Sequence, residues 1–313
     1  MKDSRGREIT YLRLSVTDLC NLRCVYCMPE KGVQKLRHED ILSVEEIGAI
    51  IRAAAKCGIT KVRVTGGEPL VRRGIIDIIR EVAAVPGIRE TCLTTNGTLL
   101  PEYAAELRAA GVARVNISLD SLKEDVYRSV TRVGELGVAL RGLDAALQCG
   151  FERVKVNAVL IGDVNDGEIR ELIGLTRRGV HVRFIELMPI GECSDWNRGR
   201  FLGGGAVLLA APELIPCGTE GVAALYKMPG ADGTVGLISP VSSHFCGTCD
   251  RIRVTADGRL KPCLHSPDEI PLRELRGAAL EDAIRRAILG KPSGHALSRG
   301  ASESLRGMNA IGG

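Results

Sequence analysis

Six short segments of the chain alternate hydrophobic with polar residues, which is the pattern of β-strands with one buried face. They are residues 11–16, 61–65, 91–95, 114–119, 154–160 and 182–187. A helix-forming stretch separates each segment from the next, and parallel strands need a crossover of that length. The alternation therefore predicts an α/β fold whose six βα units form a parallel sheet, curved into an incomplete (β/α)6 barrel.

The expected helices carry start and stop signals. Three pairs have the spacing of a capping box, namely Ser43 with Glu46, Ser121 with Glu124 and Asn165 with Glu168. Gly58, Gly111 and Gly150 stand where three of these helices should end, because glycine readily adopts the conformation that closes a helix. A last helix is expected near residues 280–289.

The polar residues of the strands form one face. Lys61, Arg63 and Thr65 alternate with two valines, and three other strands show the same alternation. The outer face of a barrel must contact apolar helices, so the polar residues should point inward. Ordinary barrels fill their interior with branched apolar side chains, so this polar, basic interior predicts a large charged ligand. A sheet with one solvated face is the alternative, but parallel sheets are normally covered on both faces.

Beyond the sixth strand the pattern changes. Residues 188–201 are rich in Gly, Pro and polar residues, and the Gly-Gly-Gly run at 203–205 predicts a hinge or turn. The run lacks the strand–loop–helix context of a phosphate-binding loop. Short strand-like pieces follow. We therefore expect two regions, a partial barrel over residues 1–190 and a C-terminal region over residues 191–313.

Composition narrows the possible functions. The 313 residues, 45% of them hydrophobic, can bury the core of one large barrel or two domains. An aromatic content of 3% argues against a base-stacking surface, and a net charge of +4 does not indicate duplex binding. No apolar run approaches the ~20 residues that span a bilayer, and no apolar signal core stands near residue 1. We expect a cytoplasmic protein without nucleic-acid or membrane partners, whose clustered cysteines bind metal.

Three of the eleven cysteines lie in a short loop directly after the first expected strand. Cys20, Cys24 and Cys27 form a CxxxCxxC pattern. Three thiolates suit a cubane iron–sulfur cluster, and because a cubane has four irons, one iron stays open to a small molecule. A structural zinc site, the alternative, usually takes four ligands in paired CxxC motifs. The loop therefore predicts an open [4Fe-4S] cluster.

A second trio of cysteines lies in the C-terminal region. Cys246 and Cys249 form a CxxC pair, and Cys263 follows fourteen residues later. His244 and His265 flank the trio and could complete a zinc site. The preferred interpretation is a second open [4Fe-4S] cluster, which implies that something other than protein occupies its fourth position.

The run TGGEP at residues 65–69 follows the second expected strand. Its glycines would let the backbone approach a ligand closely, although a tight βα turn would also explain them. Together with the CxxxCxxC loop, this run resembles the radical S-adenosylmethionine (SAM) superfamily. The resemblance implies that the open iron holds SAM and that the cofactor contacts are Tyr26, Gly67, Ser118 and Met188.

The two cysteine trios make the resemblance closer. Stretches 10–27, 63–70, 93–98, 116–121, 184–191 and 245–263 resemble the branch of the superfamily that begins molybdenum cofactor synthesis, while residues 130–140 and 203–211 depart from it. The resemblance implies GTP as the substrate, with contacts from Arg13, Arg63, Thr94, Lys155, Arg251 and Arg253. Arginine recognises phosphate in a bidentate manner and lysine adds a point charge, which agrees with the basic interior.

The same resemblance implies a radical mechanism. The reduced first cluster would give an electron to SAM, and the resulting 5′-deoxyadenosyl radical would remove the hydrogen at the 3′ carbon of GTP. Attack on carbon 8 of guanine and reduction would then yield 3′,8-cyclo-7,8-dihydro-GTP, with the guanine edge on the second cluster. The residues implied as catalytic are Arg251, Arg253, Gly312 and Gly313. The Gly-Gly tail would enter the active site, whereas a frayed terminus is the alternative.

The resemblance also implies a homodimer, an electron donor such as flavodoxin or ferredoxin, and hand-over of the product to cyclic pyranopterin monophosphate synthase. Two other functions are possible alternatives for a chain with two cysteine trios. A two-cluster radical SAM enzyme that modifies a peptide predicts acidic or apolar substrate contacts and more C-terminal cysteines. An iron–sulfur electron carrier predicts fully ligated clusters on a small scaffold. The basic interior and the single C-terminal trio favour the enzyme that acts on GTP.

Overall fold

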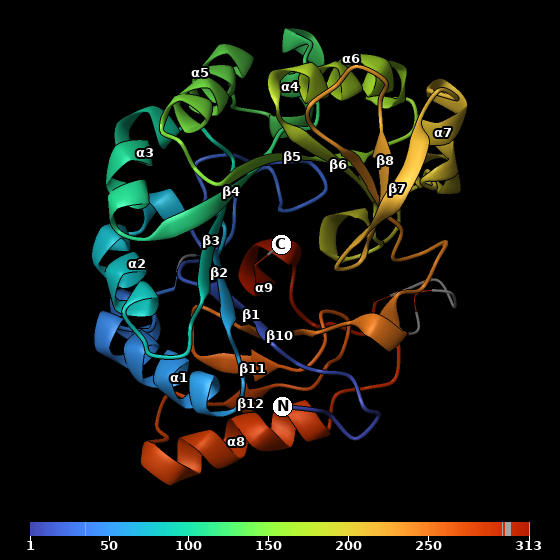
Figure 1. The fold of residues 1–313 in the computed structure, drawn as a ribbon. Helices are drawn as coiled ribbons and strands as arrows, with labels where there is room; N and C mark the ends of the chain where they lie inside the picture. Colours follow the sequence, from blue (N-terminus) through green and yellow to red (C-terminus); the bar gives the residue numbers. More distant parts are fainter. Residues whose placement is uncertain (35, 296, 298–301, 313) are drawn as a thin grey trace.

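Six parallel strands form the centre of the structure, a computed structural model that describes residues 1–34, 36–295, 297 and 302–312. They are β1 (Tyr11–Ser15), β2 (Lys61–Thr65), β3 (Glu90–Thr95), β4 (Val112–Ser118), β5 (Arg153–Leu160) and β6 (His181–Glu186). Each strand pairs in parallel with the next one along the chain. The sheet curves into an open barrel with helices outside it (Figure 1). The six predicted strands and the incomplete barrel are confirmed, with every strand end within two residues of its expected place.

Helices cover the outer face of these strands (Figure 1). They are α1 (Val44–Lys56), α2 (Ile75–Ala83), α3 (Leu100–Ala109), α4 (Glu124–Thr131), α5 (Leu136–Gln148) and α6 (Ile169–Gly174). The valines of β2, Val62 and Val64, are fully buried in the core between strands and helices. Of the described helices, none has the length and apolar character to cross a membrane.

The capping box predicted at the start of α1 is confirmed. The Ser43 side chain accepts a hydrogen bond from the Glu46 amide, and the Glu46 carboxylate accepts one from the Ser43 amide. A serine cap, a polar helix face and an apolar face were all visible in the sequence, so this local signal was sufficient.

The two other predicted caps are wrong. The Ser121 hydroxyl donates to the Glu168 carboxylate at 2.8 Å, and α4 starts after Lys123 without a side-chain cap. The Asn165 side chain accepts from the Ile161 amide and donates to the backbone carbonyls of Asp120 and Val159, rather than capping the turn that follows it. These side chains join β4 to the start of α6, because tertiary partners replaced the local ones.

The C-terminal region extends the sheet at both edges. At one edge β9 (Val235–Ile238) pairs in parallel with β6, followed by β8 (Ala223–Lys227) and β7 (Ile215–Glu220). At the other edge β10 (Arg251–Val254) pairs in parallel with β1, followed by β11 (Arg259–Lys261) and β12 (Ile270–Pro271). The C-terminal strands thus lie beside both edge strands of the six-stranded sheet, β1 and β6.

The described part of the C-terminal region has three further helices, α7 (Gly205–Ala210), α8 (Gly277–Leu289) and α9 (Met308–Ile311). The helix predicted near residues 280–289 is α8. The Gly-Gly-Gly run is not simply a hinge, because its third glycine begins α7. In Figure 1, α9 lies inside the ring of strands, beside β1 and β2. Short 3-10 turns occur at His38–Asp40, Pro69–Val71, Asp166–Glu168, Leu175–Arg178, Gly191–Cys193, Arg198–Arg200 and Cys246–Thr248.

Candidate active site

A cavity of about 420 Å³ occupies the interior of the barrel and is lined by both cysteine trios. The ten predicted cofactor and substrate contacts also line it: Tyr26, Gly67, Ser118, Met188, Arg13, Arg63, Thr94, Lys155, Arg251 and Arg253. The polar faces of the strands point into this space, as their alternation predicted. The C-terminal region contributes its own cysteines and arginines to the lining of this cavity.

The loop that carries the first trio is fixed to the turn after β2. The Gly67 amide donates to the Thr17 carbonyl at 2.9 Å, and the Glu68 amide donates to the Leu19 carbonyl at 2.8 Å. A Cβ atom at Gly67 would lie 2.4 Å from the Leu19 carbonyl oxygen, closer than real side chains approach. Glycine is therefore required at this position by the contact between the two backbones.

Glu68 anchors the same turn from inside the protein. Its buried carboxylate accepts hydrogen bonds from the Leu70 amide, the Thr95 hydroxyl and the Asn96 amide at 2.7–3.0 Å. Burial raises the pKa of Glu68 to about 7, although these hydrogen bonds oppose the rise. The residue joins the ends of β2 and β3 beneath the cavity. Its role was not predicted from the sequence, although its place in the TGGEP run was a signal.

Tyr26, between the last two cysteines of the first trio, is held by a residue that sequence reasoning missed. The Tyr26 hydroxyl donates to Asp120 Oδ2 at 2.7 Å, and the Val159 amide donates to Asp120 Oδ1 at 2.8 Å. Burial raises the pKa of Asp120 to about 6 and that of Tyr26 well above its usual value. Because Asp120 comes just after β4, this contact ties the cysteine loop to the far side of the barrel.

The first trio fits an iron–sulfur cluster in its chemistry. Burial raises the pKa of Cys20 to about 11 and that of Cys27 to about 12, and it raises that of Cys24 well above its usual value. Buried thiols of this kind stay protonated until a cation stabilises their thiolates. Three such thiols on one loop, all facing the cavity, suit the three protein ligands of an open cluster.

The second trio faces the same cavity from the C-terminal region. Cys246 and Cys249 bracket a 3-10 turn before β10, and Cys263 follows β11. Burial raises the pKa of Cys246, with the neighbouring thiols of Cys263 and Cys249 adding to the rise. These three thiols also fit the ligand set of an open cluster.

The histidines near Cys246 are not the pair, His244 and His265, that the zinc alternative named. The ligand atoms of His244, Cys246 and His295 lie within 4.8 Å of one another. His265 instead contacts the Ser302 hydroxyl at 3.1 Å and the ring of His295. His295 was not predicted, because it lies far from the cysteines in sequence.

The guanidinium groups of the cavity are positioned by hydrogen bonds. Arg63 Nε donates to the Tyr11 hydroxyl at 2.5 Å, and Arg63 Nη1 donates to the Leu93 carbonyl at 2.8 Å and to Thr94 Oγ1 at 3.4 Å. Burial, with neighbouring guanidinium groups, lowers the pKa of both Arg13 and Arg253. Several cations thus share one largely buried space, which favours a polyanionic ligand.

The described end of the chain enters this cationic region. Arg253 Nη1 donates to the Gly312 carbonyl at 2.5 Å. A Cβ atom at Gly312 would lie 2.7 Å from Thr65 Cγ2 and 3.3 Å from Ser15 Cβ, at the ends of β2 and β1. Gly313, the other predicted tail residue, lies outside the described residues.

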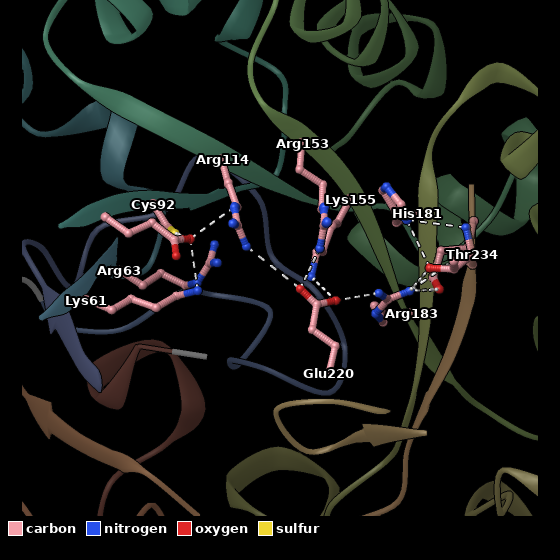
Figure 2. A network of polar contacts seen from close by, with 12 residues as sticks. Lys61, Arg63, Cys92, Arg114, Arg153, Lys155, His181, Arg183, Glu220 and Thr234 are labelled. Atoms are coloured by element: carbon pink, nitrogen blue, oxygen red, sulfur yellow. Dashed lines mark hydrogen bonds and ion pairs between the residues drawn. The ribbon is translucent and has the colours of Figure 1, made fainter. Parts of the chain in front are cut away.

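Lys155 has partners that the sequence did not reveal. Its Nζ lies 2.7 Å from Glu220 Oε2, and Arg183 Nη2 lies 2.8 Å from the same oxygen (Figure 2). Burial lowers the pKa of Lys155 to about 8 although Glu220 opposes the shift. Arg183 could have been predicted from the sequence, because it occupies an alternate position of the sixth predicted strand. Glu220 had no such signal.

Two family descriptions match consecutive parts of the chain. The Radical SAM superfamily matches residues 14–176, and Molybdenum Cofactor Synthesis C matches residues 180–297. A GTP 3′,8-cyclase of Alkaliphilus metalliredigens is 50% identical over 324 residues, and one of Alkaliphilus oremlandii is 48% identical over 320 residues, each covering 100% of both chains. A third, of Geobacter sulfurreducens, is 48% identical and covers 99% of each chain.

Two solved structures share this fold. Streptococcus suis SuiB bound to S-adenosylmethionine has a TM-score of 0.66 and 14% identity, covering 97% of this chain and 77% of that chain. The protein anSMEcpe with bound AdoMet has a TM-score of 0.56 and 13% identity, covering 91% of this chain and 78% of that chain. At these identities the likeness shows the fold alone.

Proposed function

Because this chain belongs to the GTP 3′,8-cyclase family of the radical SAM superfamily, we propose that the cavity inside its barrel holds GTP and SAM together between two cysteine trios. Its activity is the radical cyclisation of GTP in molybdenum cofactor biosynthesis, with SAM and two [4Fe-4S] clusters as cofactors. The observation that carries the proposal is that both trios and the basic strand residues line the same space.

We propose that Cys20, Cys24 and Cys27 hold the cluster that, when bound, supplies the electron for SAM cleavage. Gly67 of the TGGEP turn packs against the cysteine loop and also lines the cavity, where the cofactor would contact it. Tyr26 is fixed by Asp120 beside this loop, and Ser118 and Met188 line the same end of the barrel. These groups would orient SAM and exclude water from it.

The basic residues of β1, β2, β5 and β10 would bind GTP. Arg63 is fixed by three hydrogen bonds, so it meets a phosphate without losing side-chain freedom. Arg251 and Arg253 lie on β10, next to the second trio, where they could also act during catalysis. Thr94 and Arg13 complete the predicted set. Cys246, Cys249 and Cys263 would hold the cluster that faces the guanine.

Several finer assignments belong to the same proposal. We propose that residues 1–190 are the functional unit for SAM and residues 191–313 the unit that brings the second cluster, which agrees with the change of family match between residues 176 and 180. The sequence resemblance supports a homodimer, a flavodoxin or ferredoxin as electron donor, and hand-over to cyclic pyranopterin monophosphate synthase. We also propose a cytoplasmic location, which fits clustered cysteines that bind metal as reduced thiols.

The function is tested with the anaerobically reconstituted enzyme, GTP, SAM and a reductant. About eight irons per chain are expected for two cubanes. The mixture should release 5′-deoxyadenosine and methionine while GTP is converted to the cyclised nucleotide, as measured by chromatography and mass spectrometry. SAM consumption without loss of GTP would show that GTP is not the substrate.

Loss of single cations should weaken GTP binding. Arg13→Ala, Arg63→Ala and Lys155→Ala each remove a charge-assisted contact worth roughly 1.5–3 kcal/mol, or about ten- to hundredfold in affinity. Calorimetric titration should show this loss for GTP but little change for SAM. Arg170→Ala is the control, because Arg170 is exposed and pairs with Glu213 outside the cavity. Unchanged GTP affinity in all three variants would refute the assignment.

GTP binding should also weaken in alkaline solution. With a pKa of about 8, Lys155 is charged below that pH and neutral above it. Bound phosphate favours the charged form, so GTP affinity should fall as pH rises above about 8, by at most about tenfold per pH unit. Lys155→Arg keeps its charge and should remove the fall in calorimetric titrations. An equal fall in this variant would assign the titration to another group.

A further inference from the structure

Glu220 brings a carboxylate into the basic interior. Its oxygens lie 2.7 Å from Lys155 Nζ, 2.7 Å from Arg153 Nη1 and 2.8 Å from Arg183 Nη2, with Arg114 Nη1 at 3.8 Å (Figure 2). The cations come from β4, β5 and β6, whereas Glu220 is the last residue of β7 in the C-terminal region. Burial opposes the ionisation of Glu220, but these partners hold its pKa well below the usual range.

The position of Glu220 differs from that of an ordinary surface ion pair. The Arg183 side chain is 3% exposed and the Lys155 side chain 12% exposed, so both cations are largely removed from water. Glu220 lines the cavity together with these two residues. Cations in such a space need a counter-charge, because lost hydration and mutual repulsion are otherwise uncompensated. Glu220 provides that charge through its ion pairs.

The segment that carries Glu220 can move without disturbing the barrel. Strand β7 is the last strand of the sheet and pairs with β8, and its first five residues are exposed. Glu220 lies between Gly218 and Gly221, which have φ values of +115° and +59°. Glycine changes its backbone conformation in this region at low cost. The carboxylate can therefore leave the cavity while β8 stays paired with β9.

We propose that Glu220 is an internal counter-ion that occupies the phosphate subsite before the substrate binds and is displaced by the triphosphate of the substrate. The inference rests on the proposed function, which makes Lys155, one of these cations, a contact of GTP. A carboxylate and a triphosphate repel each other at the same cations, so one must leave when the other binds. The turn after β7 then acts as a gate whose closed state reduces the apparent affinity for polyanions.

The test compares Glu220→Gln with the wild-type holoenzyme under anaerobic conditions. Glutamine keeps the size of the side chain and removes its charge. Calorimetric titration with GTP, and with inorganic tripolyphosphate as a probe of the phosphate subsite alone, should show binding about tenfold tighter than in the wild type, as for a gate that is closed nine-tenths of the time. SAM affinity should be unchanged. Glu213→Gln is the matched control, because Glu213 pairs with Arg170 outside the cavity.

The alternative role of Glu220 is a latch that holds the β7–β8 hairpin to the barrel. A latch predicts that Glu220→Gln weakens binding of GTP and tripolyphosphate, and either that result or unchanged affinity would overturn the counter-ion. The proposed function fails separately, if Arg13→Ala, Arg63→Ala and Lys155→Ala all leave GTP affinity unchanged in the wild-type background. A loss of GTP affinity in Lys155→Ala without a gain in Glu220→Gln would refute only the counter-ion role of Glu220.

A second measurement needs no variant. Hydrogen–deuterium exchange of the wild-type holoenzyme follows the peptide over residues 215–227 with and without tripolyphosphate. A displaced Glu220 should make the amides around Gly218 and Gly221 exchange faster when the polyanion is bound. Slower or unchanged exchange would contradict displacement, even if Glu220→Gln did not fold.

Discussion

Cys24→Ala is expected to abolish reductive cleavage of SAM, whereas Cys249→Ala should retain cleavage and form no cyclised nucleotide. The two residues belong to separate trios on opposite sides of one cavity. Loss of a ligand from the first trio removes the electron source. Loss of a ligand from the second trio removes the group that would hold the guanine. Release of 5′-deoxyadenosine and formation of the nucleotide product, both measured by chromatography, separate the two effects.

The interpretation of these variants depends on cluster content. Each variant should lose about four irons, and the spectrum of the remaining cluster should persist. Cys149→Ala is the control, because Cys149 is half-buried at the end of α5 and is not among the residues that line the cavity. Equal loss of SAM cleavage in Cys24→Ala and Cys249→Ala, with the first cluster intact in the latter, would contradict the division between the trios.

Gly312→Ala is expected to suppress cyclisation of GTP while both clusters and SAM binding persist. Gly312 has a φ of +81°, and a Cβ atom there would lie 2.7 Å from Thr65 Cγ2. Backbone strain of roughly 1–3 kcal/mol, together with this overlap, should push the segment away from β1 and β2. The Gly312 carbonyl would then leave Arg253, and GTP turnover should fall by about ten- to hundredfold.

A variant at a second glycine separates the effect of backbone strain from the effect of the lost contact with β1 and β2. Gly230 has a similar φ of +73°, but a Cβ atom there would meet nothing within 4 Å. Gly230→Ala therefore carries the backbone strain alone, far from the cavity, and should leave turnover close to that of the wild type. Turnover of GTP, iron content and SAM affinity are measured for both variants. Full turnover by Gly312→Ala would show that this contact has no part in the reaction.

Local signals in the sequence were sufficient for the barrel, for the polar strand residues that line its cavity and for the two cysteine trios. The two-residue period of β2 placed Arg63 inside and Val62 outside, because neighbouring side chains on a strand point to opposite faces. The spacing of Cys20, Cys24 and Cys27 was equally local. The capping box of α1 formed because its two partners are three residues apart.

Contacts between distant segments decided the rest. Ser121 and Asn165 had the spacing of helix caps, yet each bonds to other groups because the fold brings β4, β5 and α6 together. Asp120, 94 residues from Tyr26, fixes that ring. Local spacing carries no information about such partners, because they meet only after the barrel has closed.

The sequence by itself determined the parallel strands, their inward polar face and the two cysteine trios, since each depends on the period or spacing of neighbouring residues. Only the tertiary structure decided that β9 and β10 extend opposite edges of the sheet and that Gly312 lies against β1 and β2. It also decided that Glu220 reaches Lys155 across 65 residues of sequence. Edge pairing and buried ion pairs depend on the register and packing of whole elements, which no local pattern encodes.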